Sequence, residues 1–283
     1  MFDHLLITRF NLKNPDWELT KNNENLLDDS WMSERIALFK NYCFPSVINQ
    51  SNKNFRWLLF FDVSTSAKFK TQIETLVANE KNIEVFYING MPSFNTSILN
   101  YIKDNASSKP YIITSRLDND DCISRFFIDE VQKQFNQQDF MAIDFIEGYT
   151  LQVEPEILLG KKEHIFNPFI SLIEKNKNPK TVWHYVHNLW KKEPRVKQIT
   201  GKRVWMSIIH QKNKVNEFDG YGNIDWSKLE DDFIVSEEIN TKIKNNILPF
   251  KKWWFKSLRN FLYVKMVLFS KIIKKSIGLY KVK

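Results

Sequence analysis

The segment Pro110–Cys122, PYIITSRLDNDDC, constrains the fold more than any other stretch of the chain. Its start, Tyr111-Ile112-Ile113, is aromatic and β-branched, as is typical of a buried strand. Arg116 and the carboxylates of Asp118, Asp120 and Asp121 follow directly. Carboxylates this close repel one another unless a cation neutralises them, and hard oxygen ligands suit Mg²⁺ or Mn²⁺. Because open α/β sheets bind ligands at the carboxyl ends of their strands, we expect a metal site here; a solvated acidic turn is the alternative.

Strand-like and helix-like segments alternate along the first half of the chain, which predicts an α/β fold. Such alternation is typical of a mostly parallel central sheet with crossover helices on its faces. Loop Asn11–Ser30 is polar and serves either as a lid or as a surface connection. We expect strands at His4–Phe10, Phe55–Phe61, Ile83–Ile88, Asp139–Ile146 and Trp205–His210, and helices at Trp31–Tyr42, Ala67–Ala78, Ser97–Lys103 and Ile123–Phe135.

Length and pattern suggest one large domain with an appendage. We expect a domain over residues 1–240, divided into two halves (1–146 and 147–240), and a separate tail over 241–283. Cys43 and Cys122 form neither a zinc spacing motif nor a disulfide framework, which favours a reducing compartment. The first residues do not resemble a signal peptide, so we expect a cytoplasmic protein.

The charge of the chain is unevenly distributed. The formal net charge is +8, yet residues 241–283 hold twelve of the 41 basic residues and no Asp or Glu. The remaining body is slightly acidic, which argues against a nucleic-acid binder, because binding to phosphate backbones needs a basic face on the folded domain. With only seven glycines, the chain has neither a P-loop nor a G-x-G-x-x-G motif.

Two longer patterns resemble a known enzyme family. Ser46–Ser51 followed by Phe55–Thr65 is similar to the amino-terminal signature of GT-A glycosyltransferases: a helix ending in S-x-x-x-Q, a strand and an acid-led turn. A wider pattern resembles the bacterial putative rhamnosyltransferase family over roughly residues 1–240. It consists of Glu34-Arg35, Leu38-Phe39, Tyr42–Ser46, Gln50, Asp62, Arg116–Asp121, His210 and Asn213.

The resemblance implies a GT-A fold and a sugar transfer from a nucleoside-diphosphate donor. A divalent cation, Mn²⁺ or Mg²⁺, would stabilise the negative charge of the departing diphosphate. Asp120 is then the main metal ligand, and Asp118 contacts the ribose or shares the metal. His210 matches the late histidine that such enzymes bring to the metal or diphosphate; a histidine with no ligand role is the alternative. We expect Asp121 to cap the following helix.

Four further residues are expected to bind the donor. Asp62 stands where such enzymes hold uracil or ribose, and Arg9 ends the first strand, where it would meet base or phosphate. Arg35 and Arg116 would offer guanidinium forks to diphosphate oxygens. For each arginine the alternative is a structural ion pair, with Asp62 or Asp121 as the partner.

An inverting transfer also needs a general base for the acceptor hydroxyl. Glu174 and His187 are the candidates, although neither spacing is diagnostic, and Glu174 also fits the polar face of a helix. A retaining enzyme would not use a base in this way, and the sequence leaves both outcomes open.

The tail predicts a basic amphipathic helix on a membrane surface. Between Lys251 and Lys275, apolar residues fall largely on one helical face, with most basic residues away from it and Lys265 as the exception. Lys265 and Lys271 interrupt the apolar run before it is long enough to span a membrane. We therefore expect residues 250–283 to lie on an anionic membrane surface, at the inner face of the cell membrane. A helix docked on the body, or on a partner, is the alternative.

Other functions were weighed against the same residues. A haloacid-type phosphatase needs a second aspartate where Ser64 stands, and a sugar nucleotidyltransferase needs a glycine-rich loop that His4–Ser30 lacks. A catalytically idle membrane scaffold would need no Asp118, Asp120, Arg116 and His210 together. We expect a metal-dependent hexosyltransferase that moves a sugar, rhamnose by the resemblance, to a saccharide or lipid-linked acceptor in cell-surface polysaccharide synthesis.

Overall fold

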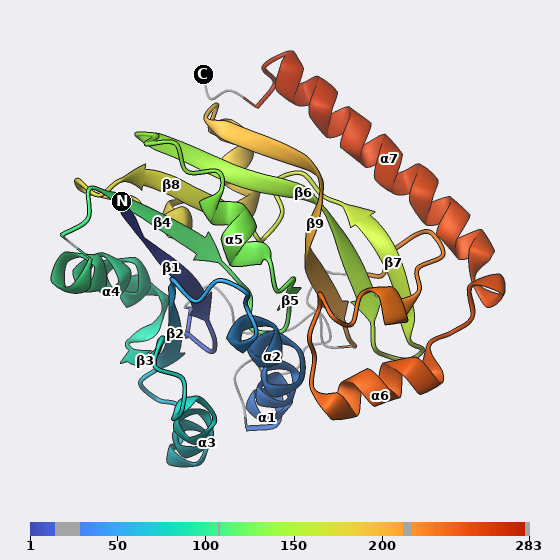
Figure 1. Ribbon diagram of the computed structural model, residues 1–283, viewed down its shortest axis with the longest axis horizontal. Coiled ribbons are helices and arrows are strands. Elements are labelled where there is room, and N and C mark those ends of the chain that lie inside the picture. Colours follow the sequence, from blue (N-terminus) through green and yellow to red (C-terminus); the bar gives the residue numbers. More distant parts are fainter. Residues whose placement is uncertain (15–28, 107, 212–216, 281–283) are drawn as a thin grey trace.

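The computed structural model describes residues 1–14, 29–106, 108–211 and 217–280. Within them, one mixed sheet of nine strands forms in the order β3-β2-β1-β4-β8-β6-β9-β5, with β7 paired to β6 (Figure 1). The first four strands run parallel, as predicted: β1 (Phe2–Arg9), β2 (Arg56–Asp62), β3 (Ile83–Ile88) and β4 (Tyr111–Arg116).

The rest of the sheet combines both orientations. Strand β8 (Ser171–Lys175) runs antiparallel between β4 and the long strand β6 (Phe140–Gln152). Strand β9 (Val196–Ile209) pairs with β6 in parallel, whereas β7 (Leu158–Glu163) and β5 (Cys122–Ile123) are antiparallel to their partners. The expectation of an α/β fold with a mixed, mostly parallel sheet is confirmed.

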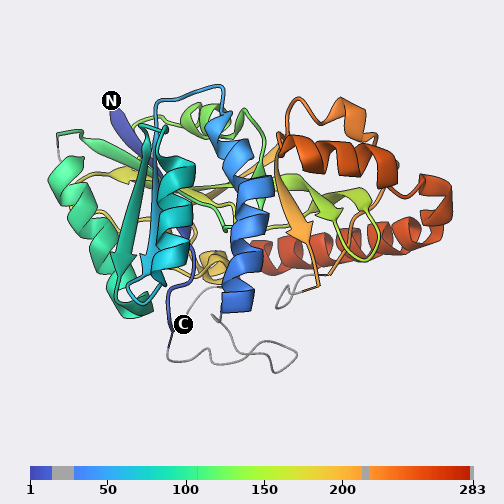
Figure 2. The same ribbon diagram turned by 90° about the horizontal axis from the view of Figure 1, so that it is seen from below.

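Alternate residues of the parallel strands bury opposite faces of the sheet, as the two-residue period of a strand requires. Leu6 and Leu59 pack against α1 (Asp29–Leu38) and α3 (Ala67–Val77), which lie side by side in Figures 1 and 2. Leu5 and Leu58 pack on the other face, beneath α4 (Gly90–Asn105). Helices on both faces therefore shield the sheet.

The helix predicted over Trp31–Tyr42 extends beyond its expected end. After α1 the chain continues as a π-helical turn, η1 (Phe39–Cys43), and then as α2 (Phe44–Ile48). Pro45 lies in the first turn of α2, where a missing N–H leaves no intrahelical bond unmade, so it restarts the helix.

The helix predicted over Ile123–Phe135 is wrong at its start. Residues Cys122 and Ile123 form β5, and only α5 (Phe127–Gln132) is helical. Long-range bonds hold the backbone between them: Ser124 N donates to Val204 O at 2.9 Å, and Arg125 N donates to Asp232 O at 2.7 Å. These backbone donors bond to distant segments and so stay outside a helix, which periodicity alone does not reveal.

The helical elements of the second half of the chain are mostly short: η2 (Val182–His184), η3 (His187–Lys192), η4 (Trp226–Lys228), α6 (Glu237–Asn246) and η5 (Phe250–Lys252). The exception is the 23-residue helix α7 (Trp254–Ser276). The predicted divisions at 146/147 and 240/241 fall inside β6 and α6 respectively.

The last helix, α7, lies along the outer side of β7 (Figure 1). Its residues Ser257, Asn260 and Val264 are buried against the body, so the helix is docked rather than free. In the part of the chain that is described, no helix has both the length and the hydropathy that a membrane span requires.

A close contact between β6 and β9 fixes the middle of the sheet. A Cβ atom on Gly148 would lie 2.2 Å from Cδ2 of Trp205. The Trp205 ring is almost fully buried, stacks on Phe169 with 5.0 Å between ring centroids, and donates from Nε1 to Phe145 O at 2.6 Å. The register of β6 against β9 shifts on either side of Glu147, next to this glycine.

We predict that Gly148→Ala destabilises the protein by about 1–3 kcal/mol, the usual cost of overpacking a core, because the indole cannot move aside. Thermal denaturation would measure the change. In the double variant Gly148→Ala/Trp205→Leu, the loss should be smaller than the sum of the two single losses. Additive losses would mean that this contact does not limit the packing.

Candidate active site

The candidate site lies at the carboxyl ends of β1, β2 and β4. The parallel register pairs Ile7 with Arg116 and Arg9 with Phe60, so these three strands end at one edge of the sheet. Asn119, in the turn after β4, donates from Nδ2 to Arg9 O at 3.2 Å and to Phe10 O at 3.4 Å. The acidic turn is thereby fixed against the end of β1, where the sequence predicted a ligand site.

Asp120 joins three elements through one carboxylate oxygen. Its Oδ2 accepts hydrogen bonds from Arg35 Nη1 on α1 and from His210 Nε2, 3.1 Å away, directly after β9. Burial of Asp120 opposes its ionisation, but the Arg35 charge and the His210 hydrogen bond outweigh this and hold its pKa below the usual range. The carboxylate is therefore charged at neutral pH.

Asp121 does not cap a helix, contrary to the prediction. Its Oδ1 accepts from Ile208 N of β9 at 2.9 Å. Burial, followed by the nearby charges of Asp120 and Asp118, raises its pKa well above the ordinary value. Asp121 thus ties the acidic turn to β9, and helix α5 begins only at Phe127.

Two guanidinium groups share one indole beside Asp118. Arg116 lies 4.2 Å from the Trp183 ring centroid and Arg9 lies 5.3 Å from it. Arg116 Nη2 also contacts Asp118 Oδ1 at 3.3 Å, and the Asp118 side chain is 30% exposed. Guanidinium groups side by side in this way offer several N–H donors in the geometry that diphosphate oxygens accept.

Several buried polar atoms here have no hydrogen-bond partner among the described residues. They are Arg116 Nε, Asn119 Oδ1 and Trp183 Nε1. Buried polar atoms are rarely left unpaired, and a polar ligand at this site would supply partners that the described residues do not.

His187 belongs to the same cluster, at the start of η3. Burial, and then the Arg116 charge, lower its pKa to about 4, while the Asp118 charge opposes the shift. The imidazole is therefore neutral at pH 7 and has a free pair of electrons. It is a weak base that lies near the predicted diphosphate site.

Glu174 lies elsewhere, on strand β8 and not on a helix. It pairs with Ile112, four residues before the end of β4, or roughly 13 Å along the strand. Its carboxylate accepts from Lys180 N at 2.9 Å and from Thr181 N at 2.8 Å. These bonds fix the loop that carries Trp183, so the described contacts of Glu174 are structural, and its role as a base stays a prediction.

Asp62 forms local bonds at the end of β2. Its Oδ1 accepts from Ser64 N at 3.0 Å and from the Ser64 hydroxyl at 2.6 Å, and its Oδ2 accepts from Lys13 N at 3.1 Å. Burial opposes ionisation, yet these hydrogen bonds lower the pKa of the carboxyl. Beside it, Asn11 Nδ2 donates to Thr65 Oγ1 at 2.9 Å, a contact that the sequence did not suggest. Recognition of a base or ribose by Asp62 stays a prediction.

The donor atoms present fit a divalent cation held partly by substrate. Asp120 and His210 offer one carboxylate and one imidazole, and Mg²⁺ commonly binds through one or two protein ligands plus substrate phosphates. Within the described ranges, no three histidine, cysteine or acidic side chains come together as a metal site, so Asp118, Asp120 and His210 do not form a complete set of metal ligands.

Two of the predicted features, Asn213 and most of the loop Asn11–Ser30, lie outside the described residues.

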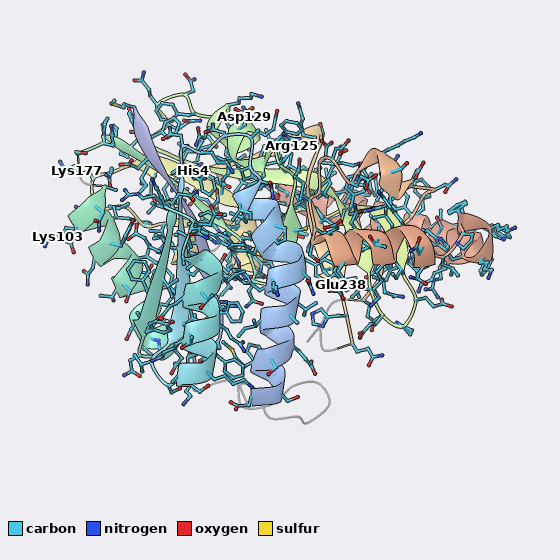
Figure 3. All side chains as sticks on the ribbon, turned by 60° about the horizontal axis from the view of Figure 1, so that its bottom comes forward. His4, Lys103, Arg125, Asp129, Lys177 and Glu238 are labelled. Atoms are coloured by element: carbon cyan, nitrogen blue, oxygen red, sulfur yellow. The ribbon has the colours of Figure 1, made fainter. Side chains whose placement is uncertain are left out.

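His4, the histidine on β1, has a structural role. His4 Nε2 lies 2.8 Å from Ser115 Oγ, and Nδ1 lies 3.2 Å from Gln132 on α5, the helix on which Asp129 is labelled in Figure 3. Burial lowers the pKa of His4 to about 3. Trp183 is the most important site residue that sequence motifs do not indicate, because no motif marks an indole that stacks on guanidinium groups.

Comparison with solved structures gives distant similarities. Residues of this chain align with S. aureus TarS 1-349 in complex with UDP-GlcNAc at 12% identity and a TM-score of 0.41, covering 75% of this chain and 60% of the other. This chain thus spans less than two thirds of that fragment. A putative nucleotide-diphospho-sugar transferase from Desulfovibrio desulfuricans G20 aligns at 6% identity and a TM-score of 0.33, covering 74% and 81%.

No curated protein sequence matches the chain. A family profile described as "Putative rhamnosyl transferase" matches residues 2–220, which include every strand and all the candidate site residues. The chain belongs to the putative rhamnosyl transferase family.

Proposed function

We propose that this protein is a metal-dependent glycosyltransferase of the hexosyltransferase class that takes a sugar from a nucleoside-diphosphate donor. One observation carries the proposal: Asp120, hydrogen-bonded to His210, lies at the same edge of the sheet as the Arg9 and Arg116 guanidinium groups. Family membership supports rhamnose as the sugar. A scaffold without activity would not need this combination, and a nucleotidyltransferase would need the glycine-rich loop that His4–Ser30 lacks.

Each group has a role in this proposal. Arg9 and Arg116 bind the diphosphate oxygens, and Trp183 holds both guanidinium planes in place. Asp118 contacts the ribose or the cation, and Asp120 and His210 hold the cation. A bound Mn²⁺ or Mg²⁺ would act as a Lewis acid that stabilises the departing diphosphate.

Arg35 has a second role in the proposal. Without a cation its guanidinium neutralises Asp120, and when a cation binds, it becomes available to the diphosphate. His187, neutral at pH 7, is the better placed of the two candidate bases for the acceptor hydroxyl. The acceptor is a saccharide or a lipid-linked saccharide of the cell surface.

We predict that one of UDP, GDP and dTDP binds in a Mn²⁺-dependent manner, and that Asp120→Ala weakens this binding at least roughly tenfold, as expected for a lost charge-assisted contact. Isothermal titration calorimetry, with and without Mn²⁺, would measure it. Asp129→Ala is the matched control, because it removes a carboxylate from α5 whose ion pair among the described residues is with nearby Lys133.

Asp120→Ala leaves Arg35 without its buried partner, so circular dichroism must establish that the variant is folded. Arg116→Gln is the second test: it should weaken nucleotide binding with and without Mn²⁺. Failure of every nucleotide to bind the folded wild type would contradict the proposal and favour a scaffold.

We further propose that α7 lies on an anionic membrane surface. Its outward stripe is apolar, with side chains 39–69% exposed: Phe255, Leu258, Leu262, Met266, Phe269 and Ile273. Residues 241–283 contain no carboxylate to oppose anionic lipid. Lys271 and Lys275 point toward the body, where they contact Ile165 O and Val196 O, so the outward face is more apolar than the sequence suggested.

We predict that Phe255→Ser/Leu262→Ser/Phe269→Ser abolishes sedimentation with vesicles containing about one third phosphatidylglycerol, because it removes most of the exposed apolar area. These positions face away from the body, so nucleotide binding should survive. Deleting residues 250–283 is a poorer test, since Trp253, Ser257 and Asn260 are buried. Phe126→Ser, at an exposed aromatic elsewhere, is the control, and unchanged sedimentation of the triple variant would contradict the anchor.

A further inference from the structure

A cavity of about 660 Å³ lies between α7, the end of β7 and residues 217–219. Its α7 wall runs from Arg259 to Lys271, which is about 18 Å at 1.5 Å per residue. The facing wall is formed by residues 162–165. None of the lining residues belongs to the candidate active site described above.

Two of the three carboxylates that line the cavity form ion pairs with cations of the body. Glu163 contacts Arg203 Nη2 at 2.8 Å and Lys265 Nζ at 3.4 Å. Asp219 pairs with Lys162 at 2.9 Å, and Glu217 is exposed.

The lining therefore retains cations for a ligand. Arg259 is exposed and has no ion pair among the described residues, and Lys271 makes one hydrogen bond, from Nζ to Ile165 O at 3.3 Å. Behind Lys271, burial raises the pKa of Asp144 to about 7, so this carboxyl is only partly charged at neutral pH. An anion at Lys271 therefore meets little opposing charge.

Most of the remaining wall is apolar. These side chains form a continuous surface on both sides of the cavity: Ile165, Phe218, Tyr263, Val264, Val267 and Leu268. A cavity with a lysine at one end and an apolar wall beyond it is complementary to an amphiphilic anion rather than to a free inorganic ion.

The lysine end of the cavity lies near η3, the element that begins with His187. Ile165 and Leu268 of the cavity wall pack in one apolar cluster with Trp190 of η3, and the Lys271 charge contributes to the lowered pKa of His187. The other end, at Arg259, lies near the start of α7, where Trp254 and Phe255 are exposed. The cavity thus extends from the first turns of α7 toward η3 and the candidate base.

We propose that this cavity binds a lipid-linked acceptor, with its phosphate at Lys271 and its hydrocarbon chain along Val267 and Val264. The sugar attached to that phosphate would then reach His187, and the chain would leave beside Arg259, whose charge meets the headgroups of the membrane. This inference rests on the proposed glycosyltransferase function and specifies its acceptor class.

Binding of farnesyl phosphate, below its aggregation concentration, tests the inference by calorimetry on the full chain. The wild type should bind it at least roughly tenfold more tightly than farnesol or inorganic phosphate, because each of these offers only half of the contacts. Lys271→Met should weaken binding by roughly tenfold through loss of the charged hydrogen bond, and Lys271→Arg should restore it. Lys274→Ala, at an exposed neighbour, is the matched control.

A second variant does not depend on the lysine. Val267→Trp fills the cavity from a half-buried position and should abolish binding of farnesyl phosphate while leaving nucleotide binding intact. Two results would overturn the inference: farnesyl phosphate binding that survives both variants, and inorganic phosphate binding as tight as that of farnesyl phosphate. Nucleotide binding, measured on the same samples, separates this failure from a failure of the proposed function.

Discussion

The buried carboxylate of Asp120 is the interaction on which the site depends. A charged group in this position is costly unless it is paired, and here a guanidinium from α1 and an imidazole from the end of β9 both bind one oxygen. Arg35 and His210 lie 85 and 90 positions from Asp120 in the chain, and these hydrogen bonds bring them together at the end of β4. Neighbouring contacts reinforce this arrangement, because Asp121 binds Ile208 N and Asn119 binds the end of β1.

The same carboxylate has to exchange partners if a cation enters. Arg35 neutralises Asp120 in the structure, while Arg9 and Arg116 remain stacked on Trp183. A cation that replaced Arg35 would leave three guanidinium groups near the diphosphate, and the negative charge of the donor would balance them. Under the proposed metal dependence, such an exchange would keep the site stable before the cation binds. In the proposed function, the cavity beside α7 would bring the acceptor from the membrane side toward the same site.

The first four strands and the location of the acidic turn could be predicted from the sequence. Strands β1 to β4 are short apolar runs, and the carboxyl ends of parallel strands lie at the same edge of a sheet. Residues outside such patterns could not. Trp183 reaches the site because Glu174 and Thr114 bind the backbone of Lys180 to Val182, contacts between distant segments that no local spacing encodes. Glu174 was interpreted as a base or a helix residue for the same reason. Likewise, β5 depends on pairing with β9, and the inward direction of Lys271 and Lys275 depends on the packing of α7.

The most direct test of the central claim is a crystal structure with Mn²⁺ and the preferred nucleoside diphosphate, with the metal located by its anomalous scattering. We predict a single strong peak between Asp120 and His210, with the diphosphate against Arg9 and Arg116 and with Arg35 turned away from Asp120. A nucleotide bound elsewhere, or bound here while Arg35 stays on Asp120 and no manganese peak lies beside it, would contradict the account.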